Sequence, residues 1–399
     1  MRIARVGARW LHAPIPPERQ HVSDFGRVAS FDMALIDVES DDGRIGWGEA
    51  KAAVGSTGAC AAIVATVEHE LGPALIGRDP RRVNALWELM YNGTRDGHSA
   101  RTGRVMPILG RRGLTVSAIS GVDMALWDML GRSLDVPVLE LWGGARHDRL
   151  PAYASGGWAD ATAIGGQLGG YVDAGFSGVK MRVGVMDGDV ATSVARVRAA
   201  REGLGDAIDL MVDAHGTFAP ADAIAFARAV EPYRIRWFEE PVSADDRAGG
   251  ARVRAAAGMP IAAGESEYTR FDFVDLVERG IADVLQPDLA ICGGPTEGRR
   301  VAALAESHQL ELAPHCWGSA LSFAAGTSLA FASPAARVVE FSLGANPFLH
   351  ELFGGVNLPI DGTVAPPSSS GFGCDPVPDV VDRYTVGAVS VSNATGGSQ

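Results

Sequence analysis

Short apolar runs recur between about residues 151 and 344, and this repeat constrains the fold more than any other feature of the chain. Eight such runs occur, at 151–154, 178–181, 210–212, 235–238, 261–263, 283–285, 310–313 and 338–339. Segments rich in Ala, Arg and Glu, which are good helix formers, separate them at 189–202, 221–230, 272–279 and 295–306. Parallel, right-handed β/α units of this length close into an eight-stranded barrel.

The segment before the repeat has a sequence pattern typical of α+β structure. Apolar and polar residues alternate over Ser30–Val38, and an Asp-Gly turn at 41–43 leads into Ile45–Gly48. This pattern predicts an antiparallel hairpin. From Ala59 onward the spacing of apolar residues becomes helical, and residues 117–132 predict a largely buried helix. With 399 residues, the chain has room for two domains, one of them near the ~250 residues of a barrel.

Charge and composition exclude several classes of protein. The chain carries 35 Lys and Arg against 48 Asp and Glu, a net charge of −13, which disfavours nucleic acid and anionic membranes as partners. No apolar run approaches the ~20 residues of a membrane span, and the first residues lack a secretory signal, so we expect a cytoplasmic protein. The four cysteines are far apart, which predicts neither disulfides nor a zinc site.

Ionisable residues follow nearly every apolar run of the repeat. They are Lys180 and Arg182, Asp213 and His215, Glu239, Glu265, Asp288, His315 and Glu340. Functional groups of a parallel barrel gather at the carboxyl ends of its strands. The pairs at 180/182 and 213/215 are spaced i, i+2, so both members of each pair are expected to face the barrel mouth.

Asp213, Glu239 and Glu265 end three consecutive predicted strands. Converging carboxylates repel one another unless a cation lies between them. Lys180 and Arg182 could pair with two of the three but hardly with all, so we favour a hard divalent cation over a network of ion pairs. All-oxygen ligation suits Mg²⁺ best, with Mn²⁺ as the alternative.

The chain resembles the mandelate racemase-like subgroup of the enolase superfamily. The matching motifs are Val179–Arg182, Met211–His215, Trp237–Pro241, Ala263–Ser266, Gln286–Asp288, Ala313–His315 and Val339–Phe341, together with the helix segment Ser120–Asp128. The resemblance implies a modified (β/α)₇β TIM barrel with an N-terminal α+β capping domain, a symmetric homo-oligomer, and one Mg²⁺ held by Asp213, Glu239 and Glu265. The expected divisions are the cap at 1–125, the barrel at 126–350, a C-terminal segment completing the cap at 351–390, and a disordered tail at 391–399.

The resemblance also implies roles around the metal. His315 would be the general base that removes a proton next to a carboxylate, and Asp288 would orient it. Lys180 would stabilise the resulting ene-diolate, and Glu340 would hydrogen-bond a substrate carboxylate oxygen. The alternative for Glu340 is a buried salt bridge to Lys180.

Two departures from the racemase pattern favour dehydration. Arg182 stands where many members of the subgroup carry a second basic lysine, and a guanidinium rarely gives up its proton. His215 resembles the general acid of acid-sugar dehydratases. We therefore expect an aldonate or aldarate dehydratase acting on a small-molecule acid sugar. The alternatives are a sugar-lactone cycloisomerase or epimerase with the same site, and a non-catalytic binding protein. Charged residues of the capping loops, such as Arg19, His21 and Lys51, are interpreted as solvated more readily than as substrate contacts.

Overall fold

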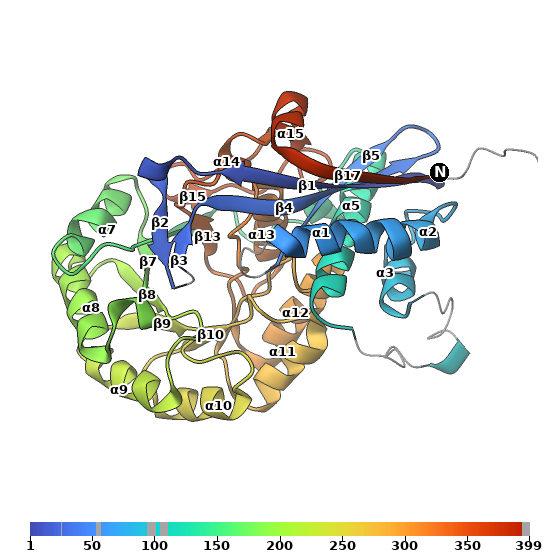
Figure 1. Cartoon of the computed structure of the whole chain (residues 1–399). Coiled ribbons are helices and arrows are strands. Elements are labelled where there is room, and N and C mark those ends of the chain that lie inside the picture. Colours follow the sequence, from blue (N-terminus) through green and yellow to red (C-terminus); the bar gives the residue numbers. More distant parts are fainter. Residues whose placement is uncertain (25, 53–56, 94–100, 104–110, 393–399) are drawn as a thin grey trace, which may run out of the picture.

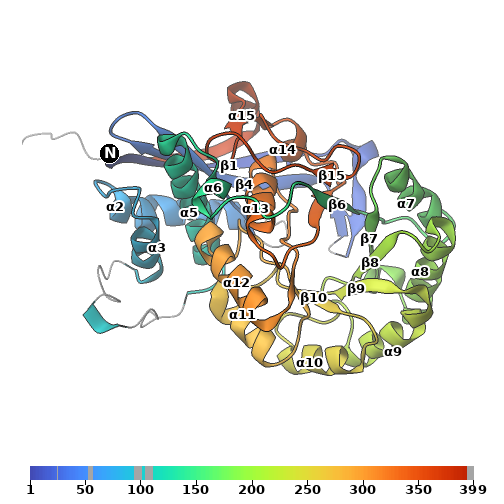
Figure 2. The same ribbon diagram turned by 180° about the vertical axis from the view of Figure 1, so that it is seen from behind.

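The computed structural model describes residues 1–392 apart from 25, 53–56, 94–100 and 104–110. A ring of strands and helices and a strand-rich cap form the two main parts (Figure 1, and from behind Figure 2). Among the described residues, no helix is long and apolar enough to cross a membrane. The structure confirms the predicted mixed α/β barrel with its cap.

Eight parallel strands form the barrel sheet in the order β12-β11-β10-β9-β8-β7-β6-β13. They are β6 (Leu150–Ser155), β7 (Gly178–Arg182), β8 (Asp209–Asp213), β9 (Ile235–Glu239), β10 (Ile261–Ala263), β11 (Val284–Leu285), β12 (Glu311–Leu312) and β13 (Val339–Ser342). A parallel bridge between Leu312 and Ala336 links the β12 end toward β13. Each of the eight predicted runs therefore contributes a strand.

A helix follows each of the first seven barrel strands, which gives the predicted (β/α)₇β order. The helices are α7 (Ile164–Asp173), α8 (Val190–Leu204), α9 (Pro220–Val230), α10 (Arg247–Ala256), α11 (Thr269–Glu278), α12 (Gly294–His308) and α13 (Ala320–Ala332). Because helices cover the outside, strands such as β7 are buried along their whole length.

An apolar layer inside the barrel determines which residues reach its mouth. Its members are Tyr153, Met211, Trp237, Ala262, Val284, Ala313 and Val338. Side chains alternate along a strand, so the residue two positions further on faces the same interior, one layer nearer the carboxyl ends. At four strands that residue is Asp213, Glu239, His315 or Glu340, which explains why these groups converge.

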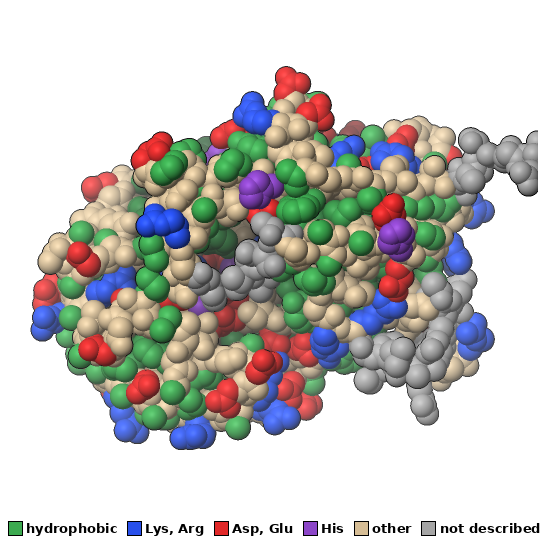
Figure 3. Space-filling model, in the orientation of Figure 1, with side chains coloured by type: hydrophobic (Ala, Val, Ile, Leu, Met, Phe, Trp, Pro, Cys, Tyr) green, Lys and Arg blue, Asp and Glu red, His purple; other side chains and the backbone are tan. Residues whose placement is uncertain are grey.

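The cap is built on an antiparallel sheet in the order β17-β1-β4-β5. Its strands are β1 (Ile3–Pro14), β4 (Ser30–Ser40), β5 (Ile45–Ala50) and β17 (Thr385–Ser392). The β4–β5 pair confirms the predicted hairpin. A second hairpin, β2 (His21–Ser23) and β3 (Gly26–Val28), lies over the barrel (Figure 1), and a hollow lies beside it on the molecular surface (Figure 3).

The C-terminal segment returns to the cap, where β17 pairs with β1. The tail was expected to be disordered from residue 391, but β17 continues to Ser392 because Val391 and Ser392 pair with Val6 and Arg5. The rest of that expectation falls on 393–399, outside the described residues.

Shorter elements also lie among the described residues. They are the helices α1 (Thr57–Thr66), α2 (Gly72–Leu75), α3 (Val83–Tyr91), α6 (Val138–Leu141), α14 (Pro347–His350) and α15 (Pro378–Tyr384), the helical turns η1 (Pro17–Arg19), η2 (Val67–Leu71), η3 (Val185–Asp187) and η4 (Glu231–Tyr233), and the strands β14 (Phe353–Gly354), β15 (Thr363–Val364) and β16 (Asp375–Pro376).

Helix α5 (Leu114–Leu134) joins cap and barrel and confirms the predicted buried helix. It runs through the expected domain boundary at residue 125 without a break. The helix packs closely on β5 because glycines line the contact: a Cβ on Gly48 would lie 1.9 Å from the backbone oxygen of Gly121. Neither backbone can move away without disturbing the cap sheet or the helix.

We therefore predict that Gly48→Ala lowers the free energy of unfolding by about 1–3 kcal/mol, the usual range for overpacking a core. Gly169→Ala in α7 is the matched control, because a Cβ there meets nothing within 4 Å. It should stabilise the protein by about 0.5–1 kcal/mol through a less flexible unfolded chain. Urea unfolding of both variants is the measurement, and an unchanged midpoint in Gly48→Ala would contradict the packing argument.

Candidate metal and proton-transfer site

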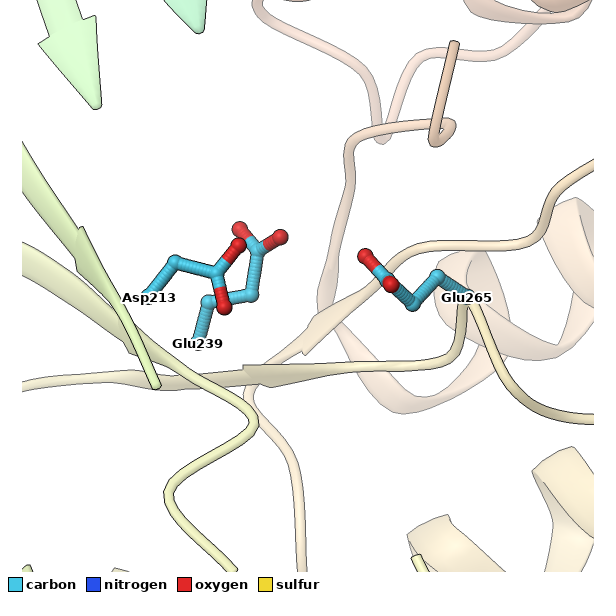
Figure 4. Close-up of side chains that lie close together, drawn as sticks. All are labelled: Asp213, Glu239 and Glu265. Carbon is cyan, nitrogen blue, oxygen red and sulfur yellow. The ribbon is translucent and has the colours of Figure 1, made fainter. Parts of the chain in front are cut away.

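Three buried carboxylates converge at the barrel mouth, as the strand pattern predicts. Asp213 ends β8, Glu239 ends β9, and Glu265 follows β10 by two residues. One ligand oxygen from each lies within 4.8 Å of the others. Figure 4 shows Asp213 and Glu239 facing Glu265 across a gap. The arrangement offers an all-oxygen ligand set to a cation.

Two cations reach this cluster from β7. The Lys180 ammonium is 3.4 Å from Asp213 Oδ2, bonds Glu239, and is 1% exposed. The Arg182 guanidinium pairs with Asp213. Burial opposes the charge on Lys180, but Glu239 and Glu340 outweigh it, so its pKa is raised. Lys180 thus pairs with two carboxylates of the triad, and Arg182 pairs with one of the same two.

Glu265 is left without a comparable partner. Among the described residues, nothing donates a hydrogen bond to its buried Oε2 atom, and the basic group within ion-pair distance is His315, whose Nε2 atom is 3.3 Å away and is charged only when protonated. A buried carboxylate oxygen without a partner is costly. The expectation that two cations cannot neutralise three carboxylates therefore agrees with the geometry, and the residues present fit a divalent cation.

His315 and Asp288 form a buried pair. His315 Nδ1 is 2.7 Å from Asp288 Oδ2, which leaves Nε2 facing Glu265 and, at 3.9 Å, Glu340. Burial alone would raise the pKa of Asp288, but the charges of Lys51 and His315 lower it. Because Asp288 holds the Nδ1 proton, Nε2 is the nitrogen that can take a proton in the pocket.

Glu340 lies on β13 beside this pair. Lys180 is 3.0 Å from its Oε1, and its Oε2 accepts the Cys316 backbone N–H at 2.9 Å. Burial raises the pKa of Glu340, but Lys180 and His315 outweigh burial and lower it. The salt bridge weighed as an alternative is thus present. An ionised Glu340 cannot donate to a substrate carboxylate, so the role that the family implies requires it to take up a proton.

His215 reaches the mouth from a turn and not from the strand. Strand β8 ends at Asp213, and His215 has a left-handed backbone with φ of 46°. Its Nε2 is 3.7 Å from Asp213 Oδ2, and its Nδ1 is 2.8 Å from Asp24 Oδ2 on the cap hairpin. Burial and the charge of Arg182 lower the pKa of His215, while burial raises the pKa of Asp24 to about 6. An ionised Asp24 is the group that would stabilise a charged His215.

An aromatic wall stands beside Arg182, whose guanidinium lies 5.5 Å from the Trp317 ring. Trp158 meets Trp317 edge to face at 6.1 Å, and His21 from the cap stacks on Trp158 at 4.2 Å. Burial and Arg182 lower the pKa of His21 to about 4, so the ring is neutral near pH 7. Arg182 is therefore held between a carboxylate and an apolar surface.

The structure corrects the interpretation of His21 and Lys51 as solvated charges, since the neutral His21 ring stacks on Trp158. It also adds Asp24 and Trp158 to the site. Lys51 is not a solvated loop charge: it is 8% exposed, and its ammonium is 2.8 Å from Asp288 Oδ2. The available signal was its position just after the strand that the sequence predicts over Ile45–Gly48. Asp24 and Trp158 follow no readable pattern. Arg19 is exposed as expected, and residues 53–56 of the second capping loop lie outside the described residues.

Similarity to known proteins agrees with this geometry. The family model "Enolase C-terminal domain-like" matches residues 164–380, and "Mandelate racemase / muconate lactonizing enzyme, N-terminal domain" matches residues 8–143. A D-galactonate dehydratase of Ralstonia nicotianae is 38% identical over 78% of this chain and 78% of its own length.

A second sequence relative and a solved structure are also similar to this chain. A D-galactarolactone cycloisomerase of Agrobacterium fabrum is 30% identical over 88% of this chain and 90% of its own. The solved structure of a racemase from Streptomyces coelicolor A3(2) with bound magnesium has a TM-score of 0.83 at 31% identity, covering 96% of this chain and all of that one. The fold, the carboxylate triad and these matches lead to one conclusion: the chain belongs to the enolase superfamily, in its mandelate racemase and muconate lactonizing enzyme family.

Proposed function

We propose that the chain is a Mg²⁺-dependent hydro-lyase that dehydrates an acid sugar, an aldonate or an aldarate. The observation that carries the proposal is the position of His315 Nε2, 3.3 Å from the third carboxylate of the triad. A base and a metal site then share one pocket, which suits abstraction of a proton next to a carboxylate. The similarity to D-galactonate dehydratases at 36–39% identity supports the substrate class.

Asp213, Glu239 and Glu265 would hold the Mg²⁺, with Mn²⁺ as a substitute. When bound, the ion supplies Lewis-acid stabilisation of negative charge on the substrate carboxylate. Lys180 lies beside the same carboxylates and supplies a second positive charge that the protein has already desolvated and oriented. Arg182, fixed against Trp317, is suited to bind a carboxylate or stabilise charge, since it cannot act as a base.

The chain's own residues account for the proton transfers. His315 Nε2 takes the proton from C2, and the released electron pair enters the ene-diolate. That pair then forms the C2–C3 double bond while the C3–O bond breaks, and His215 delivers the proton that lets the hydroxyl leave as water. The enol that remains tautomerises to the 2-keto-3-deoxy acid. One base and one separate acid are what this elimination requires.

Cycloisomerisation of a sugar lactone is the second candidate, supported by the cycloisomerase relative at 30% identity. It uses the same base but retains the hydroxyl. A binding protein of the same fold that catalyses no reaction is the third candidate. A cytoplasmic location and a symmetric homo-oligomer remain predictions from the sequence and its family resemblance.

A panel of mono- and diacid sugars with Mg²⁺, including D-galactonate, should yield a 2-keto acid from at least one member. His315→Asn is the control, because the amide keeps a polar side chain but cannot act as a base. Its turnover should fall by the factor of about 10²–10⁴ that general bases supply. Deuterium from solvent in recovered substrate or a lactone, without 2-keto acid, would favour the isomerase. Absence of both reactions across the panel would favour a binding protein.

Glu265→Gln should weaken Mg²⁺ binding by at least the about 10–100-fold that is lost when a residue supporting a ligand is changed, because one of three anionic ligands is itself removed. The measurement is the Mg²⁺-dependent rise in unfolding temperature without substrate. A Mg²⁺ concentration of about 100 times Kd stabilises the folded protein by about 2.7 kcal/mol. Glu267→Gln is the matched control: Glu267 is buried two residues away but pairs with Arg247 at 2.5 Å. Equal Mg²⁺ responses in both variants would contradict the ligand assignment.

A further inference from the structure

The carboxyl end of cap strand β5 reaches into the barrel and touches the segments that carry the His315–Asp288 pair. Lys51 follows β5 directly, and its ammonium lies 2.8 Å from Asp288 Oδ2 while donating to the Trp317 carbonyl. The backbone N–H of Lys51 also donates to Ala290 at 3.3 Å. One cap residue thus contacts the loop after β11 and the loop after β12.

Glu49, the last but one residue of β5, secures the second of these loops. Its side chain is buried and accepts the Ser319 backbone N–H at 3.2 Å, and the Ser319 hydroxyl as well. The loop is therefore bound on both sides of Gly318, by Lys51 at Trp317 and by Glu49 at Ser319. Since His315 stands four residues before Ser319, these contacts limit how far the loop can drift.

Asp288 is the point where the contacts meet. Its Oδ1 accepts the Ala290 backbone N–H at 2.8 Å, and its Oδ2 is shared between His315 Nδ1 at 2.7 Å and Lys51 Nζ at 2.8 Å. Asp288 is fully buried, and a buried carboxylate that loses a charged partner is strongly destabilised or turns toward another donor. Without Lys51, the Asp288 carboxylate would lose one of its three partners, and the orientation in which it holds the imidazole would be less well fixed.

We propose that Lys51 is a positioning residue for the proton-abstracting pair: from the cap, it fixes Asp288 and the Trp317 loop so that His315 Nε2 stays aimed at the reacting carbon. Lys51 acts through Asp288 and need not touch substrate. The catalytic part of this inference rests on the proposed function. The geometric part, the orientation of His315, does not.

The test compares Lys51→Met, Lys51→Gln and Lys51→Arg with the wild type. Methionine removes charge and hydrogen bonding, glutamine keeps a donor for the Trp317 carbonyl, and arginine keeps the charge. Arg254→Met is the matched control, since it breaks a cation–aspartate pair with Asp283 at the opposite end of the β11 unit. If Lys51→Met does not fold, Lys51→Gln takes its place.

The first readout needs no substrate. A hydrogen-bonded Nδ1 proton of His315 gives a downfield proton NMR signal, assigned by its loss in His315→Asn. The signal should persist in wild type, Arg254→Met and Lys51→Arg, and it should shift or vanish in Lys51→Met and Lys51→Gln. An unchanged signal in the neutral variants overturns the proposal, whatever the enzyme's substrate.

The second readout uses the acid sugar that the wild type dehydrates best, with D-galactonate as first choice. In the neutral variants kcat and kcat/KM should fall together by about 10–100-fold, as for a 1 Å misplacement, and the isotope effect with C2-deuterated substrate should rise. A purely structural role would reduce the active fraction without changing the isotope effect, and that result contradicts the proposal. An inactive wild type contradicts the proposed function instead, and the NMR comparison still decides the role of Lys51.

Discussion

Buried negative charge at the mouth of the barrel is the constraint on which the rest of the site depends. Asp213 and Glu239 end neighbouring strands and Glu265 follows the next one, so the three carboxylates converge, and Lys180 and Arg182 pair with the first two. No group in the described part of the chain donates a hydrogen bond to Glu265 Oε2. Buried carboxylates this close repel one another unless a further positive charge lies between them. The same repulsion therefore favours binding of a cation.

Much of the site could be predicted from sequence because a buried strand has a period of two. Met211 and Trp237 fill the barrel interior, so Asp213 and Glu239, two residues on, must face the same interior one layer higher. This logic finds residues at strand ends. It placed His215 on the strand, whereas His215 belongs to a turn with positive φ. It also placed Glu265 at the end of its strand, whereas β10 ends two residues earlier, at Ala263.

Contacts between cap and barrel could not be predicted in the same way. Asp24 meets His215 across 191 residues, and Lys51 meets Trp317 across 266. No periodicity connects positions so far apart, and a lysine after a strand resembles a solvated charge until the opposing loop is known. The cap nevertheless places one charged residue beside each of these groups, Asp24 beside His215 and Lys51 beside Asp288. The proposed chemistry therefore depends on both parts of the molecule.

Crystals grown with Mn²⁺ offer the most direct test of the central claim, because the ion's anomalous scattering locates it independently of chemistry. We expect a single strong peak bonded to one oxygen each of Asp213, Glu239 and Glu265, with the Arg182 guanidinium displaced from Asp213. A peak elsewhere, or carboxylates that remain paired with Lys180 and Arg182 at saturating Mn²⁺, would contradict it.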